Sequence, residues 1–327
     1  VGRHEFPSET ISRAIHYPVG GALSNSQQIV LAHSRRFHTL CPMLDTLSYL
    51  DRRKRMIDTA LDAEIPPASE RPAVLHRAIR YSVFSGGKRL RPILCMASAE
   101  AAGGRPRDAL FPALALELLH TYTLIHDDLP CMDDDDLRRG KPTCHIAFGE
   151  ANALLAADAL QAMAFGMLAK ASVPSRYPPA ALLLELAQAA GSRGVVGGQV
   201  EDLAAGKKQL NAAAVEYIHL HKTADLFRAA TRMGAIAANA GRQELQALTD
   251  YGVSVGLAFQ ITDDILDGVG KKRRLDKSSC LSVYGLSKAR KRSAALVHEA
   301  VTALKRLESR RAEPLAALAQ CVAGRVR

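Results

Sequence analysis

The chain has 327 residues, of which 48% are hydrophobic and 5% aromatic, with no Trp. This length is sufficient for a sizeable core, and the many Ala and Leu residues are strong helix formers, which favours an all-α protein over a β-rich one. The formal net charge of +10 suits an anionic partner, but no interleaving of aromatic and basic residues supports nucleic-acid binding.

Residues 1–44 show little periodicity and contain only two acids, Glu5 and Glu9. This composition is typical of a transit segment or a disordered tail. The stretch could equally be upstream sequence translated by mistake, because Met43 stands just before the first convincing helix. We therefore expect the folded domain to cover residues 45–327. The six Cys, none in a CxxC pair, indicate a reduced compartment, so we expect a cytoplasmic protein, or an organellar one if residues 1–44 are a transit segment.

From Leu44 onward the helical periodicity is almost unbroken, and no apolar run approaches the roughly 20 residues that span a bilayer. We therefore predict a single antiparallel bundle of about ten helices without a transmembrane segment, and none of the strands that a βαβ unit requires. The predicted helices cover about 44–63, 71–84, 89–102, 108–129, 150–172, 179–204, 211–239, 243–266, 287–308 and 312–325.

An acidic cluster follows the apolar helix predicted over 108–129. It runs from Asp127-Asp128 to Asp133-Asp134-Asp135-Asp136, six acids in ten positions, and Arg138-Arg139-Gly140-Lys141 comes directly after it. Four consecutive Asp residues are unfavourable in a helix and repel one another without a countercharge. A solvated acidic loop is the simplest interpretation of this cluster alone, but an apolar helix leads directly into it.

A second acidic cluster, Asp263-Asp264-Ile265-Leu266-Asp267, lies in another very apolar predicted helix. Asp263 and Asp267 are four positions apart and share one helix face. Acids in such a segment are rarely buried without a partner. Two such clusters facing each other would provide the oxygen ligands that Mg²⁺ prefers, together with phosphate oxygens and water.

The ordered set of motifs in residues 45–325 resembles the trans-isoprenyl diphosphate synthase family, and within it the bacterial-type farnesyl diphosphate synthases. Each motif alone is weak, but their order and spacing are highly specific. The matching segments are Gly86-Gly87-Lys88-Arg89-Leu90-Arg91-Pro92, His126-Asp127-Asp128-Leu129-Pro130, Asp136-Leu137-Arg138-Arg139-Gly140, Gly149-Glu150-Ala151-Asn152-Ala153, Asp158-Ala159-Leu160, Gly197-Gly198-Gln199, His221-Lys222-Thr223, Phe259-Gln260 and Asp263-Asp264-Ile265-Leu266-Asp267.

The resemblance implies a prenyltransferase that joins isopentenyl diphosphate head to tail with dimethylallyl or geranyl diphosphate. It implies Mg²⁺ as the cofactor, in three ions, with Mn²⁺ as a substitute. These ions would neutralise the departing diphosphate, which is a Lewis-acid role. An allylic carbocation forms, and the double bond of isopentenyl diphosphate attacks it. The implied metal residues are Asp127 and Asp133, with Asp128 assisting, and the second cluster of Asp263, Asp264 and Asp267.

The resemblance also assigns the substrate-binding residues. Lys88, Arg91, His120 and Arg139 match the pocket for isopentenyl diphosphate, where Arg suits bidentate phosphate contacts and Lys supplies a point charge. Arg138 and Lys222 match positions that hold the allylic diphosphate. Lys222, Thr223 and Gln260 are the implied catalytic residues, the last two beside the reacting carbons. Without the resemblance, His120 could equally be an ordinary helix histidine, and Lys88 and Arg91 surface cations.

One segment departs from the family pattern. After Asp267 this chain is about ten residues shorter than the family pattern. The Lys that usually binds the diphosphate falls in the missing stretch. Lys271 or Lys272 could replace it, because a long ammonium side chain reaches far from a loop. If neither does, the binding of the allylic substrate and the closure of the site would suffer.

The resemblance leaves three functions open. The first is an active synthase, and Tyr122, just before the first acidic cluster, would narrow the product tunnel, so that farnesyl diphosphate is favoured over geranylgeranyl diphosphate. The second is a weakly active or non-catalytic subunit, because of the shortened segment. The third, a terpene cyclase, is disfavoured by the retained pocket for isopentenyl diphosphate. The family also implies a homodimer.

Overall fold

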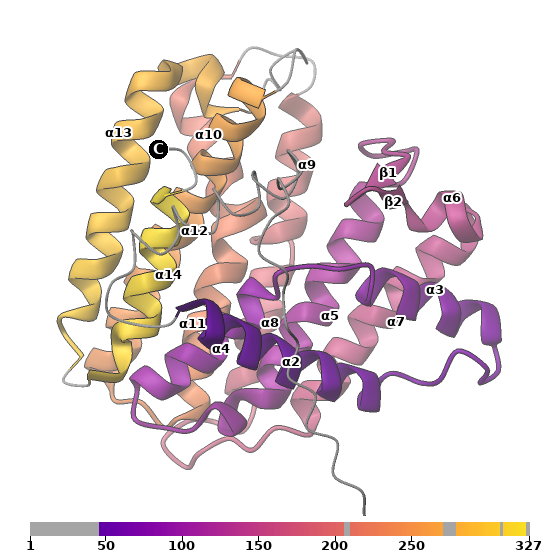
Figure 1. Ribbon diagram of the computed structural model, residues 1–327, viewed down its shortest axis with the longest axis horizontal. Helices are drawn as coiled ribbons and strands as arrows, with labels where there is room; N and C mark the ends of the chain where they lie inside the picture. The colour runs from indigo at the N-terminus through magenta and orange to yellow at the C-terminus, as the bar shows by residue number, and fades with distance from the viewer. Residues whose placement is uncertain (1–45, 206–209, 271–278, 308–309, 325–327) are drawn as a thin grey trace, which may run out of the picture. The chain divides into compact units, whose positions relative to one another are not determined.

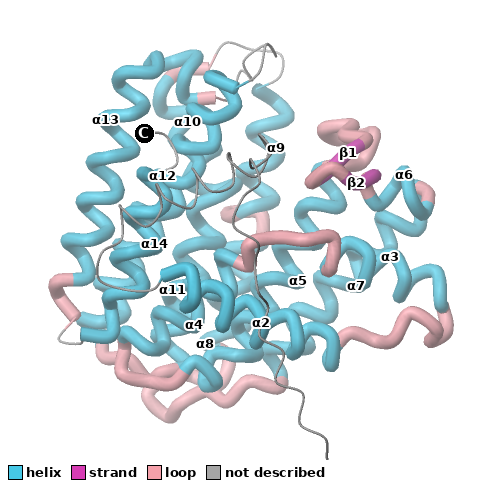
Figure 2. The backbone as a smooth tube through the Cα atoms, viewed as in Figure 1, coloured by secondary structure: helices cyan, strands magenta, loops and turns pink. Residues whose placement is uncertain are grey.

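The computed structural model describes residues 46–205, 210–270, 279–307 and 310–324 (Figure 1). The predictions for residues 1–44, Lys271 and Lys272 therefore lie outside the described residues. Helices make up nearly all of the regular secondary structure in the described chain, and the two strands are very short (Figure 2). The prediction of an all-α bundle is confirmed.

The elements follow one another along the chain with short connections. The α-helices are α2 Thr46–Glu64, α3 Ala73–Val83, α4 Leu90–Ala101, α5 Leu110–Asp127, α6 Cys144–Phe148, α7 Glu150–Ala169, α8 Ala181–Ala190, α9 Val195–Ala205, α10 Ala212–Ile218, α11 Asp225–Ala237, α12 Arg242–Gly270, α13 Cys280–Leu304 and α14 Glu313–Gly324. The short elements are the 3₁₀ turns η1 Pro106–Ala109 and η3 Arg310–Ala312, the π-helical segment η2 His219–Ala224, and the antiparallel pair of β1 Leu137–Arg138 and β2 Lys141–Pro142.

The core is centred on α4, α5, α11 and α12. Helix α5 packs along α7, α11 lies against both α4 and α12, and α12 packs along α13. The interior side chains of α5 are completely buried, among them Leu114, Leu116, Leu118 and Leu119. Because α5 is apolar on nearly every side, it must sit inside the bundle, and this fixes the position of the acidic cluster that follows it.

Two helix predictions need correction. The single helix predicted over 179–204 is two helices, α8 and α9, separated by the segment from Gly191 to Gly194. A Cβ atom on Gly194 would lie 2.1 Å from the Ala189 carbonyl oxygen, so the chain can turn this tightly only with glycine. Helix α13 begins with a short turn from Cys280 that was not predicted, and the Ser279 side chain caps this turn by accepting from the Leu281 amide at 3.3 Å. Gly285, with a non-helical φ of 70°, separates this turn from the long stretch that corresponds to the helix predicted from about residue 287.

Helix α7 satisfies the length and composition criteria for a membrane span, and it is the single such helix within the described part of the chain. In the most apolar window, 39% of α7 is buried inside the protein. Its inner face, with Ala153, Ala156 and Leu160, is fully buried. Since α7 packs along α5, its apolar character is explained on that side by the core.

The segment from α10 to α11 is helical without interruption, but η2 in its middle is π-helical. A π turn contains one more residue than an α turn, and such insertions often occur at functional positions. η2 carries His219, Lys222 and Thr223, two of which belong to the residues implicated by sequence.

Candidate active site

The first acidic cluster does not continue α5 but folds back onto its end. The Asp133 amide donates to the Asp127 carbonyl at 2.9 Å, and the Asp134 amide donates to the Leu129 carbonyl at 3.2 Å. Asp134 adopts a positive φ of 54°, which an Asp tolerates better than most residues. The loop therefore returns Asp133 to the end of α5, close to Asp127.

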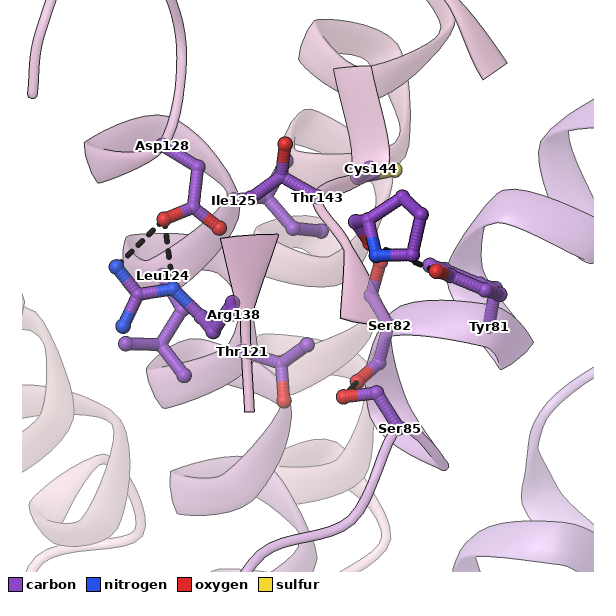
Figure 3. A pocket seen from close by; sticks show the side chains of 11 residues that line it. Tyr81, Ser82, Ser85, Thr121, Leu124, Ile125, Asp128, Arg138, Thr143 and Cys144 are labelled. Carbon is purple, nitrogen blue, oxygen red and sulfur yellow. Dashed lines mark hydrogen bonds and ion pairs between the residues drawn. The ribbon is translucent and has the colours of Figure 1, made fainter. Parts of the chain in front are cut away.

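Asp128, at the end of α5, is buried and paired with Arg138 from β1 (Figure 3). Arg138 Nε and Nη2 lie 2.6 and 2.5 Å from the same oxygen, Asp128 Oδ1. Burial raises the pKa of Asp128, although Arg138 opposes the shift. This pair borders a small pocket whose wall includes Ser82, Ser85 and Thr143. The short β-hairpin thus places one cation of the predicted allylic site directly on the first acidic cluster.

Asp127 lies opposite Lys222 of η2. Burial raises the pKa of Asp127 to about 6, with Lys222 acting in the opposite direction and Asp133 adding to the rise. Burial lowers the pKa of Lys222, but the carboxylates of Asp202 and Asp127 outweigh it, so that the net shift is upward. Lys222 Nζ donates to Asp202 Oδ2 at 2.5 Å. The ammonium is therefore held charged beside the first acidic cluster.

Arg91 and His120 form the centre of the predicted pocket for isopentenyl diphosphate. Arg91 Nη1 lies 3.0 Å from His120 Nε2, and the Arg91 guanidinium lies 4.9 Å from the centre of the Phe227 ring. Burial lowers the pKa of Arg91 to about 10, with Asp263 acting in the opposite direction. Burial and the adjacent Arg91 hold the pKa of His120 well below its usual range. Since an Arg can only donate, a neutral His120 accepts at Nε2 and carries its proton on Nδ1.

Arg139 and Lys88 complete that group. Arg139 Nη1 donates to the Gly86 carbonyl, and a Cβ atom on Gly87 would lie 2.9 Å from the same nitrogen. Gly87 has a φ of 134°, so both its backbone and its missing side chain suit the close approach of Arg139. Lys88 is exposed at the edge.

Arg89, between Lys88 and Arg91, faces inward instead. It is 4% exposed and has a positive φ of 51°. Its guanidinium donates to Glu117 at 2.6 Å, to Asp58 at 2.8 Å and to the Val83 carbonyl at 2.7 Å. A buried charge with this many partners fixes the backbone of the loop that carries its two neighbours.

The second acidic cluster is connected to η2 by a chain of hydrogen bonds. Thr223 Oγ1 donates to Gln260 Oε1 at 2.7 Å, and Gln260 Nε2 donates to Asp264 Oδ1 at 3.0 Å. The other oxygen, Asp264 Oδ2, accepts from the Cys280 amide at 2.6 Å. η2 therefore lies between the two clusters, with Lys222 at the first and Thr223 at the second.

The carboxylates of the two acidic clusters provide part of the ligand set that a hard dication such as Mg²⁺ requires. No group of three or more His, Cys, Asp or Glu side chains that could hold a metal is found among the residues described. Mg²⁺, however, is usually bound by only one or two carboxylates, together with phosphate oxygens and water. Partial burial and the nearby Asp133 together raise the pKa of Asp127, and a bound dication would relieve this cost.

A family model for polyprenyl synthetases matches residues 72–313 of this chain. The chain belongs to the polyprenyl synthetase family. It is 43% identical over 277 residues to the farnesyl diphosphate synthase of Escherichia coli, an alignment that covers 81% of this chain and 93% of that one. It is 41% identical over 297 residues to the large subunit 1 of the heterodimeric geranylgeranyl pyrophosphate synthase of Arabidopsis thaliana, covering 86% and 80% of the two chains.

Solved structures of this family have the same fold. An FPP/GFPP synthase from Zymomonas mobilis superposes with a TM-score of 0.76 at 36% identity, and the match covers 85% of this chain and 99% of that one. This polyprenyl synthetase is therefore a prenyltransferase, as the order of its motifs indicates. The names of its relatives include both farnesyl and geranylgeranyl synthases, so both product lengths considered from the sequence agree with them.

In this polyprenyl synthetase most residues implicated by sequence are brought into one region. Arg91 interacts electrostatically with Asp263 and Arg139, and Lys222 with Asp127. Three residues that contact or position the predicted site residues were not expected from the sequence, namely Arg89, Asp202 and His219. Of these, Asp202 had a recognisable signal, because it lies one helical turn after Gln199 on α9.

Proposed function

We propose that this chain is a farnesyl diphosphate synthase that extends dimethylallyl and geranyl diphosphate with isopentenyl diphosphate. The observation that carries the proposal is the position of η2, whose Lys222 meets the partly buried Asp127 while Thr223 bonds to Gln260 beside the second acidic cluster. Cations and carboxylates brought together in this way suit a diphosphate that arrives with metal ions.

The cofactor of this proposal is Mg²⁺, in up to three ions, with Mn²⁺ as a substitute. Asp127 and Asp133, with Asp128 assisting, would hold the ions of the first cluster, and the second cluster, led by Asp263 with Asp267, would complete the set. Mg²⁺ supplies charge neutralisation at the diphosphate when it is bound. The raised pKa of Asp127 supports this role, because a buried carboxylate gains most from a nearby dication.

The chain's own residues orient the two substrates. Arg91, His120 and Arg139, with Lys88 at the rim, would bind isopentenyl diphosphate, and Arg138 and Lys222 would bind the allylic diphosphate. His120 keeps its neutral form beside Arg91, so it holds the guanidinium by accepting a hydrogen bond rather than by opposing charge. The oxygens of Thr223 and Gln260 would face the developing cation, whose charge their dipoles stabilise.

The length of the product is assigned from Tyr122. This side chain is 9% exposed in α5, and its ring contacts the His126 ring edge to face at a centroid distance of 4.8 Å. The Tyr122 ring, just over one helical turn before Asp127, and the His126 ring against it would reduce the space into which a growing chain extends. A geranylgeranyl diphosphate synthase is the second candidate, because several relatives are named for that product.

Three further features belong to this proposal. The synthase domain begins near residue 45, the protein is a homodimer, and its compartment is the cytoplasm, or an organelle if residues 1–44 are a transit segment. The chloroplastic names of several relatives agree with the second location.

The test is an assay of the purified protein with Mg²⁺, isopentenyl diphosphate and geranyl diphosphate, with the products sized after extraction. We expect farnesyl diphosphate, and no product with EDTA or in Asp127→Ala. A geranylgeranyl product would retain the chemistry and reject the assignment from Tyr122. A folded protein that binds diphosphates but forms no product would support the non-catalytic subunit instead.

A further inference from the structure

Both carboxylate oxygens of Asp264 are engaged by other groups of the protein. Asp264 is 9% exposed. Its Oδ1 accepts from Gln260 Nε2 at 3.0 Å, and its Oδ2 accepts from the Cys280 amide at 2.6 Å and lies 3.3 Å from His219 Nε2. These partners come from α12, α13 and η2, so the carboxylate joins three elements.

This engagement conflicts with the metal role that the sequence pattern suggests for Asp264. A metal ion at either oxygen would have to share that oxygen with the donor from Gln260 or Cys280, and displacing such a donor would leave it unpaired, which is costly. His219 Nε2, at 3.3 Å, also faces this carboxylate. Three groups of the protein therefore already face the negative charge of Asp264.

The same contacts determine how Gln260 is oriented. A carboxylate only accepts hydrogen bonds, so the Gln260 group that faces Asp264 must be the NH₂. The Gln260 carbonyl oxygen is then turned toward Thr223, whose hydroxyl donates to it at 2.7 Å. Without Asp264 the amide could rotate and present its NH₂ group where an oxygen is needed.

Asp264 also holds the start of α13. The Cys280 amide is the first N–H of that helix, next to the capping residue Ser279. A carboxylate at a helix N-terminus is stabilised by the unpaired amides and by the helix dipole. The position at which the described chain resumes after residue 270 is therefore fixed to the catalytic helix α12.

We infer that Asp264 is a positioning residue rather than a metal ligand, and that it fixes the Gln260 carbonyl and the Thr223 hydroxyl toward the reacting carbons. The part concerning the reacting carbons rests on the proposed function. The separation of Asp264 from the metal does not, because it is argued from the contacts of Asp264 alone.

A direct test uses the wild-type protein. Crystals grown with Mn²⁺ and inorganic pyrophosphate would locate the ions by anomalous scattering. We expect no Mn²⁺ peak at coordinating distance from either oxygen of Asp264, and the contacts to Gln260 and Cys280 retained. A Mn²⁺ ion bonded to Asp264 would overturn the inference, whether or not the protein makes a prenyl product.

A pair of adjacent isosteric variants tests the same point in solution. Mn²⁺ binding in the presence of pyrophosphate is measured by electron paramagnetic resonance for Asp264→Asn and for its control, Asp263→Asn. We expect Asp264→Asn to bind within about twofold of wild type and Asp263→Asn to bind at least about tenfold more weakly, which is 1.4 kcal/mol. An equal loss in both variants would reject the positioning role.

The link to Gln260 is tested by a double-mutant cycle on kcat with Asp264→Asn, Gln260→Ala and the double variant. Asp264→Asn should lower kcat with little change in the Mg²⁺ concentration required for half-maximal rate. If Asp264 acts through Gln260, the double variant should be no slower than Gln260→Ala. Fully additive losses, or an unchanged kcat in Asp264→Asn, would contradict the inference. If wild type itself is inactive, the proposed function fails while the two Mn²⁺ experiments still decide the role of Asp264.

Discussion

Asp127 carries a carboxylate that the folded protein tolerates poorly. Burial raises its pKa to about 6, compared with roughly 3.9 in an unfolded chain. Between these values the folded protein keeps the proton that the unfolded chain loses, so the free energy of unfolding falls as pH rises through this window. Below about pH 4 both states are protonated and the cost disappears.

We predict that Asp127→Asn stabilises the metal-free protein at pH 7.5 by up to about 3 kcal/mol, the equivalent of the pKa shift. The same variant should lose activity, because the amide no longer carries the negative charge that attracts a dication. Urea unfolding at pH 7.5 and at pH 4, both with EDTA, measures the effect, which should shrink at the lower pH.

The exposed Asp133 provides the matched control. Asp133→Asn should change stability by less than about 0.5 kcal/mol, as surface substitutions usually do, while it also reduces activity. Equal stabilisation by Asp127→Asn at both pH values would show that the gain does not come from the buried charge.

Individual site residues could be predicted from the sequence by residue type and motif order, but their partners could not. The acids and cations around Asp127 stand in recognisable motifs. Asp264 stands in one as well, yet its contacts to His219 and Cys280 depend on two other elements that meet only in the fold. Arg89 lies among exposed cations in the sequence, and nothing in its motif indicates that it is buried between Asp58 and Glu117.

At the level of elements, the loop between α3 and α4 determines how the pocket for isopentenyl diphosphate is built. Gly86 and Gly87 both have positive φ, but only Gly87 would bring a Cβ atom against Arg139, at 2.9 Å, whereas nothing lies within 4 Å of a Cβ on Gly86. The two positions thus share the backbone strain of a substitution and differ in the contact with Arg139.

We predict that Gly87→Ala raises the KM for isopentenyl diphosphate by about tenfold more than Gly86→Ala does, since a displaced charged hydrogen bond is worth at least about 1.4 kcal/mol. The KM for the allylic substrate should change similarly in both variants. Steady-state kinetics with each substrate varied in turn measures the difference. Equal KM values for isopentenyl diphosphate in the two variants would remove Arg139 from that pocket.

Helix positions were largely predictable from periodicity, and the failures have identifiable causes. The segment from Gly191 to Gly194 interrupts an Ala- and Leu-rich run whose composition alone reads as continuous helix. The π-helical η2 cannot be recognised from the pattern, because a single extra residue in a turn hardly alters the apolar spacing. The β-hairpin was missed because each strand has only two residues.

For the whole molecule, the outer face of α6 and α7 carries exposed aliphatic side chains. Ile146 on α6 is 52% exposed, and Leu154 and Leu155 on α7 are 45% and 56% exposed, although α7 meets the length and composition criteria for a membrane span. Clustered exposed aliphatic side chains of this kind commonly mark a protein interface. This face is the candidate surface for the proposed homodimer.

We predict that Leu155→Glu converts the proposed homodimer into a monomer, because a charge would be buried without a partner at the proposed interface. Size-exclusion chromatography with light scattering measures the mass. Leu47→Glu, at a position 46% exposed on α2, is the control and should remain dimeric. A monomeric wild-type protein would reject the homodimer itself.

The π turn at η2 has a consequence for the rod formed by α10 and α11. Each residue advances an α-helix by about 100°, so one inserted residue offsets the faces of α10 and α11 by that angle. The stretch before η2 keeps one phase to pack against α9 and α13, and the stretch after it keeps another to pack against α4 and α12. Deleting one residue from η2 would bring both halves into the same phase, and only one of the two packing surfaces could then be satisfied.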